Sequence, residues 1–191
     1  GVIKSTNQYY NKEKARMQSQ LKTINKKDWS NRLQKLTEKR NNKIKYLMHV
    51  YSKRIIDYCL ENGFDTIVCG YNKEWKQESA MTKKVNQKFV TIPYEIFISM
   101  LDYKALDSGK KFILNEESYT SGTSFLDNEF PVKENYDKSR RVYRGLFKSN
   151  TGKLINADVN GSYQIMKKVF PNVFDNGIEG AGCHPMSMKI A

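Results

Sequence analysis

Apolar residues recur every three or four positions through the first third of the chain, which is the spacing of amphipathic helices. This pattern predicts one helix over residues 7–27 and a longer one over residues 31–62. Asp28-Trp29-Ser30 separates the two, and Gly63 is a natural helix stop. The apolar stripes consist of Tyr10, Met17, Leu21 and Ile24, followed by Leu33, Leu36, Ile44, Met48, Tyr51, Ile55 and Cys59.

The middle of the chain changes from long helices to short apolar runs. Residues 64–69 and 112–114 have the composition of short buried strands. Residues 71–91 are polar with scattered aromatic residues and predict a loop. A helix is expected over residues 93–109, because proline is tolerated in a first turn and glycine favours a helix end.

The last third combines an irregular segment, a hairpin and one more amphipathic helix. Residues 122–140 are polar and irregular, and residues 140–155 predict a hairpin around Asn150-Thr151-Gly152. The final helix is expected to begin at Asp158 and to end at Pro171, with Val159, Tyr163, Met166 and Phe170 on its apolar side. The order of elements predicts an α/β layer with a helical arm at the N-terminal end.

Positive charge is concentrated at the start of the chain. The formal net charge is +13, and residues 1–54 hold 15 Lys or Arg against 3 Asp or Glu, a net charge of +12. Residues 55–191 are close to neutral, with 18 basic and 17 acidic residues. Such a distribution is typical of a nucleic-acid-binding segment, although a solvated helical surface gives the same composition.

Cysteine usage and hydropathy indicate the compartment. Cys59, Cys69 and Cys183 are few, widely spaced and odd in number, which argues against a disulfide framework and suits a reducing cytosol. We find no apolar run of about 18 residues that would span a membrane and no signal peptide. The sequence therefore predicts a cytoplasmic protein without a membrane partner.

The run Leu154-Ile155-Asn156-Ala157-Asp158-Val159-Asn160-Gly161 places Asp158 where a short apolar strand ends and a helix begins. A carboxylate at such a junction is fixed by the backbone and open to solvent, as a Mg²⁺ ligand must be. The alternative is that Asp158 only caps the helix, because aspartate is a favoured N-cap residue.

A second acidic feature lies 41 residues earlier, where the strand over residues 112–114 runs into Glu116 and Glu117. Successive side chains of a strand point to opposite faces, so at most one of the two shares a site with Asp158. An acidic pair at a strand end is otherwise a solvated edge.

The motifs "NEESYTS" and "INADVNGSYQI", together with "STNQYYNK", "KRNNKIKYLMHVYSKRIIDYC" and "DTIVCGYNKEWKQ", resemble the C-terminal half of the TnpB (OrfB) proteins of bacterial insertion sequences. These are relatives of the type V CRISPR nucleases. The resemblance implies a RuvC-like nuclease of RNase H fold that uses a guide RNA from the transposon end. It also implies cleavage of DNA with Mg²⁺ (or Mn²⁺) held by three carboxylates.

The carboxylates of this chain depart from the family pattern. The chain opens at Gly1-Val2-Ile3-Lys4-Ser5, which resembles the segment just after the strand that carries the first catalytic Asp. That Asp is therefore expected to be absent, and the sequence to be a fragment. Gly70 stands where the family's usual second acid ends a strand. Some members carry a glutamate just before the Thr-Ser pair instead, so the resemblance favours Glu117, with Glu116 behind it, as the catalytic partner of Asp158.

The zinc ribbon of the family is also expected to be absent as a metal site. It would fall between Thr120 and Asp158, and that interval contains no cysteine. Because a structural zinc site needs four thiolate or imidazole ligands, we expect no zinc.

Three groups of residues are candidates for contacts with DNA or guide RNA. The first follows the second helix, the second lies in the loop after the central strand, and the third flanks the hairpin near the acids. They are Lys39, Arg40, Lys43 and Lys45; Tyr71, Trp75 and Lys76; and Arg140, Arg141 and Arg144.

The predicted fold is an RNase H-like (RuvC-type) α/β fold that lacks its first strands. Its expected parts are a basic helical segment (1–62), core strands and helix (63–121), a degenerate zinc-ribbon-like insertion (122–153) and a final helix and tail (154–191). The favoured function is the C-terminal nuclease portion of an RNA-guided DNA endonuclease. The alternatives are a nuclease-dead nucleic-acid-binding relative and an inactive truncated transposon remnant.

Overall fold

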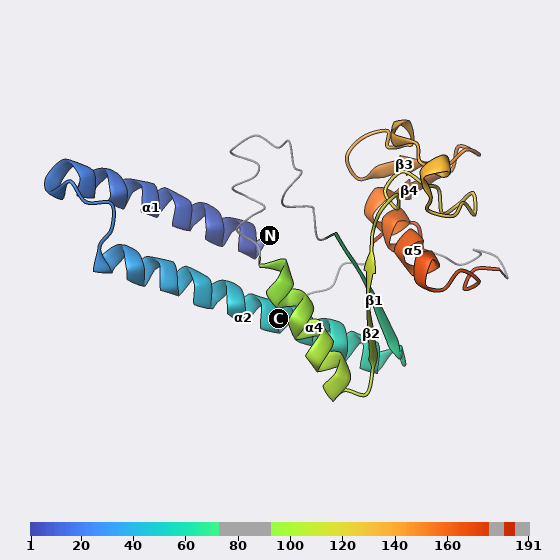
Figure 1. Cartoon of the computed structure of the whole chain (residues 1–191), viewed down its shortest axis with the longest axis horizontal. Helices are drawn as coiled ribbons and strands as arrows, with labels where there is room; N and C mark the ends of the chain where they lie inside the picture. Colours follow the sequence, from blue (N-terminus) through green and yellow to red (C-terminus); the bar gives the residue numbers. More distant parts are fainter. Residues whose placement is uncertain (73–92, 176–181, 186–191) are drawn as a thin grey trace. The chain divides into compact units, whose positions relative to one another are not determined.

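The computed structural model describes residues 1–72, 93–175 and 182–185, which form two compact units (Figure 1). Unit 1 contains residues 1–65 and the helix that ends before Gly109. Unit 2 contains the strands, the last helix and the irregular segment between them. The chain is therefore a mixed α/β protein, in agreement with the predicted class.

Unit 1 consists of helices α1 (Val2–Asn25), α2 (Asn31–Glu61) and α4 (Tyr94–Asp107). The first and second form a hairpin (Figure 1). Ser30 caps α2 by accepting a hydrogen bond from the backbone N–H of Leu33. Gly63 ends it with a φ of 67°, which glycine adopts at little cost. The helix α1 begins five residues before the predicted start.

The core of unit 1 joins α2 to α4. Ile44 and Met48 from α2 pack against Met100 from α4, and Ile3 and Phe97 complete the cluster. The neighbouring α2–α4 contact is polar, because the ammonium of Lys104 donates to the Oγ of Ser52 at 2.7 Å and to a carbonyl of α2 at 2.8 Å. The expected four-part division grouped residues 93–109 with the strands, whereas this packing places α4 in unit 1.

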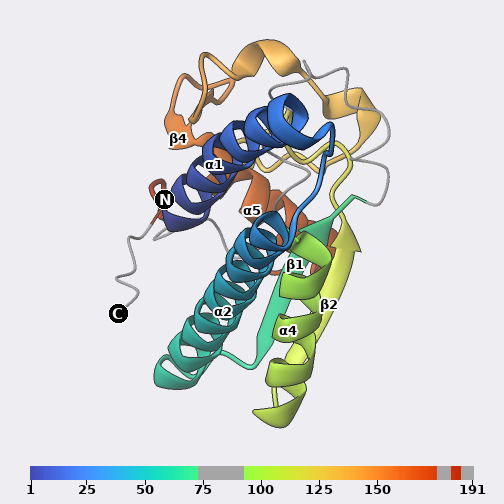
Figure 2. The ribbon, with the colours of Figure 1, turned by 90° about the vertical axis from the view of Figure 1, so that its left-hand side faces the viewer.

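Unit 2 is built on the parallel strands β1 (Thr66–Tyr71) and β2 (Lys111–Glu116), which lie side by side in Figure 2. Helix α5 (Ala157–Val169) packs on both strands. Strands β3 (Leu146–Lys148) and β4 (Leu154–Asn156) form the predicted hairpin. The expected strand over residues 64–69 begins two residues later, because Gly63 and the exposed residues after it belong to the helix end.

The hairpin of unit 2 differs from the sequence prediction in where its first arm begins. The first arm of the hairpin does not begin at residue 140, because residues 138–140 form a 3₁₀ turn, η3 (Lys138–Arg140). A second turn, η2 (Lys133–Asn135), precedes it. The irregular character predicted for residues 122–140 is confirmed, and the core beneath this segment consists of Phe125, Phe147, Ile155 and Ala157.

The irregular segment is held to α5 by polar side chains that face inward. Asn160 is fully buried, and it accepts from the N–H of Phe125 at 2.9 Å and donates to the carbonyl of Thr123 at 2.8 Å. Gln164, one turn later, donates to the carbonyl of Glu129. Lys167 donates to the carbonyl and side-chain oxygens of Asn128. Helix α5 therefore holds the irregular segment by hydrogen bonds, since the segment has few apolar residues that could pack against the helix.

Replacing Asn160 with alanine should lower the stability of unit 2 strongly. The substitution leaves a buried N–H and a buried carbonyl without partners, which costs about 3 kcal/mol in total. The measurement is the urea midpoint of unfolding, with Asn172→Ala as the control, because Asn172 is exposed and lies beyond the helix. Equal midpoints for the two variants would contradict this role of Asn160.

Candidate active site and nucleic-acid groove

Asp158 lies in the first turn of α5 and does not cap it. The cap is Asn156, whose side-chain oxygen accepts from the N–H groups of Asp158 at 2.9 Å and Val159 at 3.2 Å. The side chain of Asp158 is 87% exposed, and the guanidinium of Arg141 lies 3.9 Å from its carboxylate. The capping alternative for Asp158 is therefore wrong, and its carboxylate is available to a ligand.

Glu116 and Glu117 have different surroundings. The carboxylate of Glu116 accepts from the hydroxyl of Ser118 at 2.6 Å and from its N–H at 3.1 Å, and Lys168 lies 3.3 Å away. The hydrogen bond from Ser118 and, after it, the contact with Lys168 hold the pKa of Glu116 below its usual value. Glu117 instead lines a cleft together with Asp158.

This cleft has a volume of about 410 Å³ and lies between α5 and residues 117–121. Glu117 lines it from the turn after β2, Asp158 and Ser162 from α5, and Arg141 from the segment before β3. Most of its lining is polar, with hydroxyl, carboxylate and guanidinium groups. The cleft therefore brings together two of the predicted acids and one of the predicted arginines. We expect the carboxylates of Glu117 and Asp158 to lie within about 8 Å of each other, near enough to share a two-metal site.

Gly70 leaves space for the carboxylate of Glu117 beside β1. A Cβ atom at position 70 would lie 3.0 Å from Oε2 of Glu117 and 2.5 Å from Cδ1 of Ile165. Position 70, the last but one of β1, therefore has no room for a side chain, because the carboxylate of Glu117 and the side chain of Ile165 fill that space. Burial, with Glu117 as the second cause, raises the pKa of the neighbouring Cys69 thiol.

The other residues predicted to contact nucleic acid, near the hairpin and in the loop after the central strand, have different surroundings. Arg140 is largely buried and donates to Glu129 at 2.6 Å, and this bond raises the pKa of its guanidinium. Arg144 is exposed, and Tyr71 is half-buried at the end of β1. The remaining two candidates, Trp75 and Lys76, lie outside the described residues.

A groove of about 440 Å³ between α1 and α2 contains most of the basic residues predicted on the second helix. Lys39 and Lys43 line it one turn apart, and Tyr9, which is 63% exposed, lines it from α1. Arg40 stacks on Tyr10, with 5.5 Å between the guanidinium carbon and the ring centroid. Tyr9 and Tyr10 were not predicted as nucleic-acid contacts, although the "QYYNK" motif places them in the helix that precedes the basic one.

Lys45 lies outside this groove. It is exposed and only two residues from Lys43, and residues spaced by two lie on different faces of a helix. Arg40 has a second role, because its Nε donates to the buried side chain of Asn7 at 2.8 Å. Lys39 and Lys43 are therefore the two basic groups that are best placed to contact a ligand in the groove.

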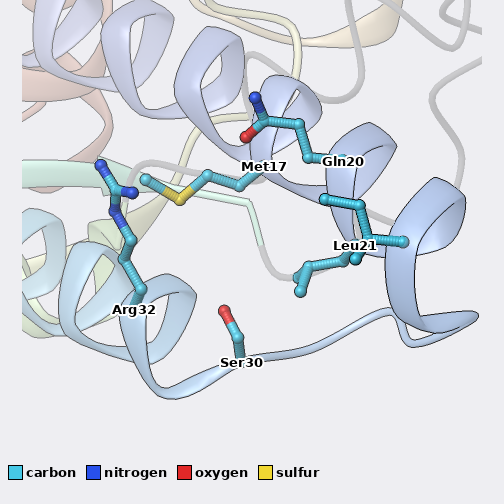
Figure 3. Close-up of a pocket in the computed structure, with 6 residues that line it drawn as sticks. Met17, Gln20, Leu21, Ser30 and Arg32 are labelled. Atoms are coloured by element: carbon cyan, nitrogen blue, oxygen red, sulfur yellow. The ribbon is translucent and has the colours of Figure 1, made fainter.

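A smaller hollow of about 180 Å³ lies where α1 ends and α2 begins (Figure 3). Its lining is mainly apolar, with Met17 and Leu21 from α1 and Arg32 from α2. Its described lining contains no carboxylate and no thiol, and the hydroxyl of Ser30 is engaged in capping α2.

The acids of the cleft fit a hard divalent cation. Mg²⁺ prefers oxygen ligands and is commonly held by one or two carboxylates together with waters and substrate phosphates. Glu117 and Asp158 supply two such groups from different elements. Within residues 1–72, 93–175 and 182–185, no group of three His, Cys, Asp or Glu side chains is placed to hold a metal ion. The third carboxylate expected of a two-metal site is thus not found among these residues.

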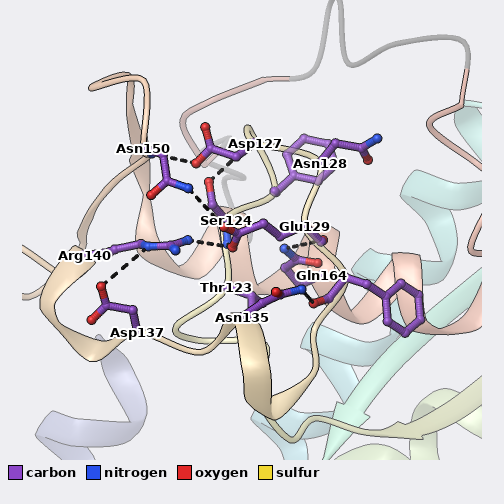
Figure 4. Close-up of polar contacts among 12 residues, drawn as sticks. Thr123, Ser124, Asp127, Asn128, Glu129, Asn135, Asp137, Arg140, Asn150 and Gln164 are labelled. Atoms are coloured by element: carbon purple, nitrogen blue, oxygen red, sulfur yellow. Dashed lines mark hydrogen bonds and ion pairs between the residues drawn. The ribbon is translucent and has the colours of Figure 1, made fainter.

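The irregular segment is held together around Glu129 (Figure 4). Its carboxylate accepts from the N–H of Ser124, from Arg140 and from the side chain of Asn150. Asp127 accepts from the N–H of Asn150 at 2.7 Å, so the β3–β4 turn is tied to the same network. Hydrogen bonds and the Arg140–Glu129 ion pair thus connect parts of the segment that are far apart in the sequence.

We expect purified protein to contain no stoichiometric zinc, because residues 121–157 include no cysteine and the Glu129 network already ties residues 124–129 to Arg140 and Asn150. Elemental analysis measures the zinc content of the protein. Melting curves with and without a strong chelator test whether zinc stabilises the fold, and the two curves should superimpose. One zinc ion per chain, or a chelator-dependent melting temperature, would contradict this prediction.

Comparisons with known proteins agree with the resemblance seen in the motifs. Residues 1–76 match the OrfB_IS605 family, described as "Probable transposase", and residues 94–165 match the family described as "Cas12f1-like, TNB domain". The chain belongs to the TnpB/OrfB family. No match was found among curated proteins.

Among solved structures, this TnpB/OrfB-family chain is similar to a chain of the structure titled "Cryo-EM structure of the Cas12f1-sgRNA-target DNA complex". The TM-score is 0.56 and the identity 20%, over 82% of this chain and 40% of the Cas12f1 chain. At this identity the similarity shows the fold, and this chain corresponds to less than half of that protein. In the part of the chain that the structure describes, no helix is long and apolar enough to cross a membrane.

Proposed function

We propose that this chain is the C-terminal nuclease portion of a TnpB-type RNA-guided DNA endonuclease with an RNase H-like (RuvC-type) fold. The observation that carries the proposal is that Asn156, and not Asp158, caps α5. The carboxylate of Asp158 is therefore exposed, and it lines the same cleft as Glu117. A capping role would have accounted for Asp158 without any chemistry, and Asn156 performs that role instead.

Hydrolysis of a phosphodiester requires that charge on the non-bridging oxygens is neutralised and that a water molecule is placed in line with the leaving oxygen. A bound Mg²⁺ supplies both effects. Glu117, in the turn after β2, and Asp158, in α5, would hold the ion. The guanidinium of Arg141, 3.9 Å from Asp158, is placed to bind a phosphate beside it.

The geometry at Gly70 supports Glu117 as the second acid. The carboxylate of Glu117 lies 3.0 Å from the point where a side chain at position 70 would begin. A glutamate after β2 thus brings its carboxylate next to the position on β1 where the family pattern places an acid. Glu116, which is bound to Ser118 and Lys168, is not available in this way.

The groove in unit 1 supports the binding of nucleic acid, namely guide RNA and target DNA, by this chain. Lys39 and Lys43 supply charge for phosphates, and Tyr9 offers an exposed ring on which a base can stack. Their location agrees with the +12 net charge of residues 1–54.

A nuclease-dead nucleic-acid-binding protein is the second candidate. It is favoured by the finding that the described residues offer two converging acids where a two-metal mechanism uses three. The two functions are separated by joining this chain to a first nuclease strand that carries an Asp and supplying a guide RNA. Mg²⁺-dependent cleavage of the complementary DNA supports the nuclease, and binding without cleavage supports the second candidate.

A further inference from the structure

Lys168, in the last turn of α5, binds both neighbours of Glu117. Its ammonium lies 3.0 Å from the carbonyl oxygen of Glu116 and 3.2 Å from that of Ser118. It also lies 3.3 Å from the carboxylate of Glu116 and 3.0 Å from the hydroxyl of Ser118. The side chain of Lys168 is only 17% exposed. An ammonium has three donors, so these four acceptors share all of its hydrogen-bonding capacity.

The turn around Glu117 is fixed from both sides as a result. The carbonyls before and after Glu117 are held by Lys168, and its own carbonyl accepts from the hydroxyl of Thr120 at 2.8 Å. Among the described residues, no hydrogen bond or ion pair to the carboxylate of Glu117 is found. The backbone of this residue is therefore restrained while its carboxylate remains available.

The same helix carries the other acid. Asp158 lies in the first turn of α5 and Lys168 in the last, about 15 Å apart along a rigid axis. The lysine thus attaches the turn that bears Glu117 to the helix that bears Asp158. From this arrangement we infer that Lys168 is a positioning residue that sets the placement of Glu117 relative to Asp158 for a divalent cation. This inference rests on the proposed function of the cleft.

The sign of the effect distinguishes positioning from simple electrostatics. Loss of a positive charge near a cation site strengthens cation binding by Coulomb attraction. Loss of a group that orients a ligand weakens it, by about 10- to 100-fold in known metal sites. Lys168→Met should therefore weaken Mn²⁺ binding by about tenfold. Lys168→Arg, which retains donors and charge, should recover most of the affinity.

The experiment is a titration of the chain with Mn²⁺, in which free Mn²⁺ is followed by electron paramagnetic resonance and folding by circular dichroism. Lys148→Met is the matched control, because Lys148 is an exposed lysine on β3 and loses the same charge. Ser118→Ala removes one acceptor of Lys168 without a change of charge. It should weaken binding in the same direction, and it decides the question if Lys168→Met does not fold.

Unchanged or tighter Mn²⁺ binding by folded Lys168→Met, or by Ser118→Ala in its place, would overturn the positioning role. Failure of the proposed function has a different signature. In that case Glu117→Gln and Asp158→Asn bind Mn²⁺ as the wild type does, or the wild type binds none, and the inference about Lys168 falls with it.

Discussion

Replacement of Asp158 with asparagine should reduce DNA cleavage by at least about a thousandfold when this chain is joined to a first nuclease strand that carries an Asp. Asparagine keeps the size of the side chain and can still pair with Arg141, but it removes the negative charge that holds the cation. Loss of one metal-binding carboxylate removes most of the charge stabilisation that a metal ion gives to the transition state. The measurement is single-turnover cleavage of guide-complementary DNA with saturating Mg²⁺.

The other acids provide the controls for this prediction. Glu117→Gln should cause a loss of similar size, because both carboxylates line the cleft. Glu116→Gln should cause a smaller loss, and Glu134→Gln, at an exposed turn, should have no effect. A greater loss with Glu116→Gln than with Glu117→Gln would show that the wrong acid was chosen. Full activity of Asp158→Asn and Glu117→Gln would exclude the cleft as the active site.

The double substitution Lys39→Gln and Lys43→Gln should flatten the salt dependence of nucleic-acid binding. Each lysine that contacts a phosphate contributes about one unit to the slope of log K against log salt concentration, so the slope should fall by about two units. The affinity near physiological salt should fall with it. The measurement is fluorescence anisotropy with a labelled RNA or DNA at several salt concentrations.

Lys45→Gln is the matched control, because it removes the same charge from the same helix outside the groove. Its slope should change by less than one unit. A third variant, Tyr9→Leu, should weaken binding without a change of slope if the exposed ring stacks on a base. Equal effects of Lys45→Gln and Lys43→Gln would show that only overall charge matters, and binding that does not depend on salt would contradict the groove.

The helices were largely predictable because their boundaries depend on local signals. Gly63 and Gly109 both adopt a positive φ just after helices, and Pro171 follows the end of α5. The start of α1 was misplaced because Val2 and Ile3 are followed by five polar residues, 4–8. Ile3 is nevertheless helical, since it packs against the core of unit 1. Tertiary packing decided this boundary, and the local sequence does not report it.

The site was predictable in its residue types and not in its arrangement. Asp158 was identified at a strand-to-helix junction with helix capping as the alternative, and only the structure shows that Asn156 is the cap. Strand alternation separated Glu116 from Glu117 without assigning their partners. Lys168 lies 52 residues from Glu116, and no local pattern indicates that contact.

The inward-facing polar residues of α5 were missed for a similar reason. The sequence shows an apolar stripe, and Val159 and Tyr163 do pack on the core. Asn160, Gln164 and Lys167 are buried as well, because their partners are backbone groups of the irregular segment. Backbone acceptors have no signature in the side-chain sequence, so this second buried face could not be predicted.

Iron-directed cleavage of the polypeptide tests the central claim most directly, because it locates a cation without requiring nuclease activity. Fe²⁺ bound in place of Mg²⁺ produces hydroxyl radicals with ascorbate and peroxide, and these radicals cut the backbone beside the ion. The chain should be cut near residues 117–121 and 158–162, and the cuts should disappear in the Glu117→Gln, Asp158→Asn double variant. Cutting elsewhere, or cuts at these positions that persist in the double variant, would contradict a metal site shared by Glu117 and Asp158.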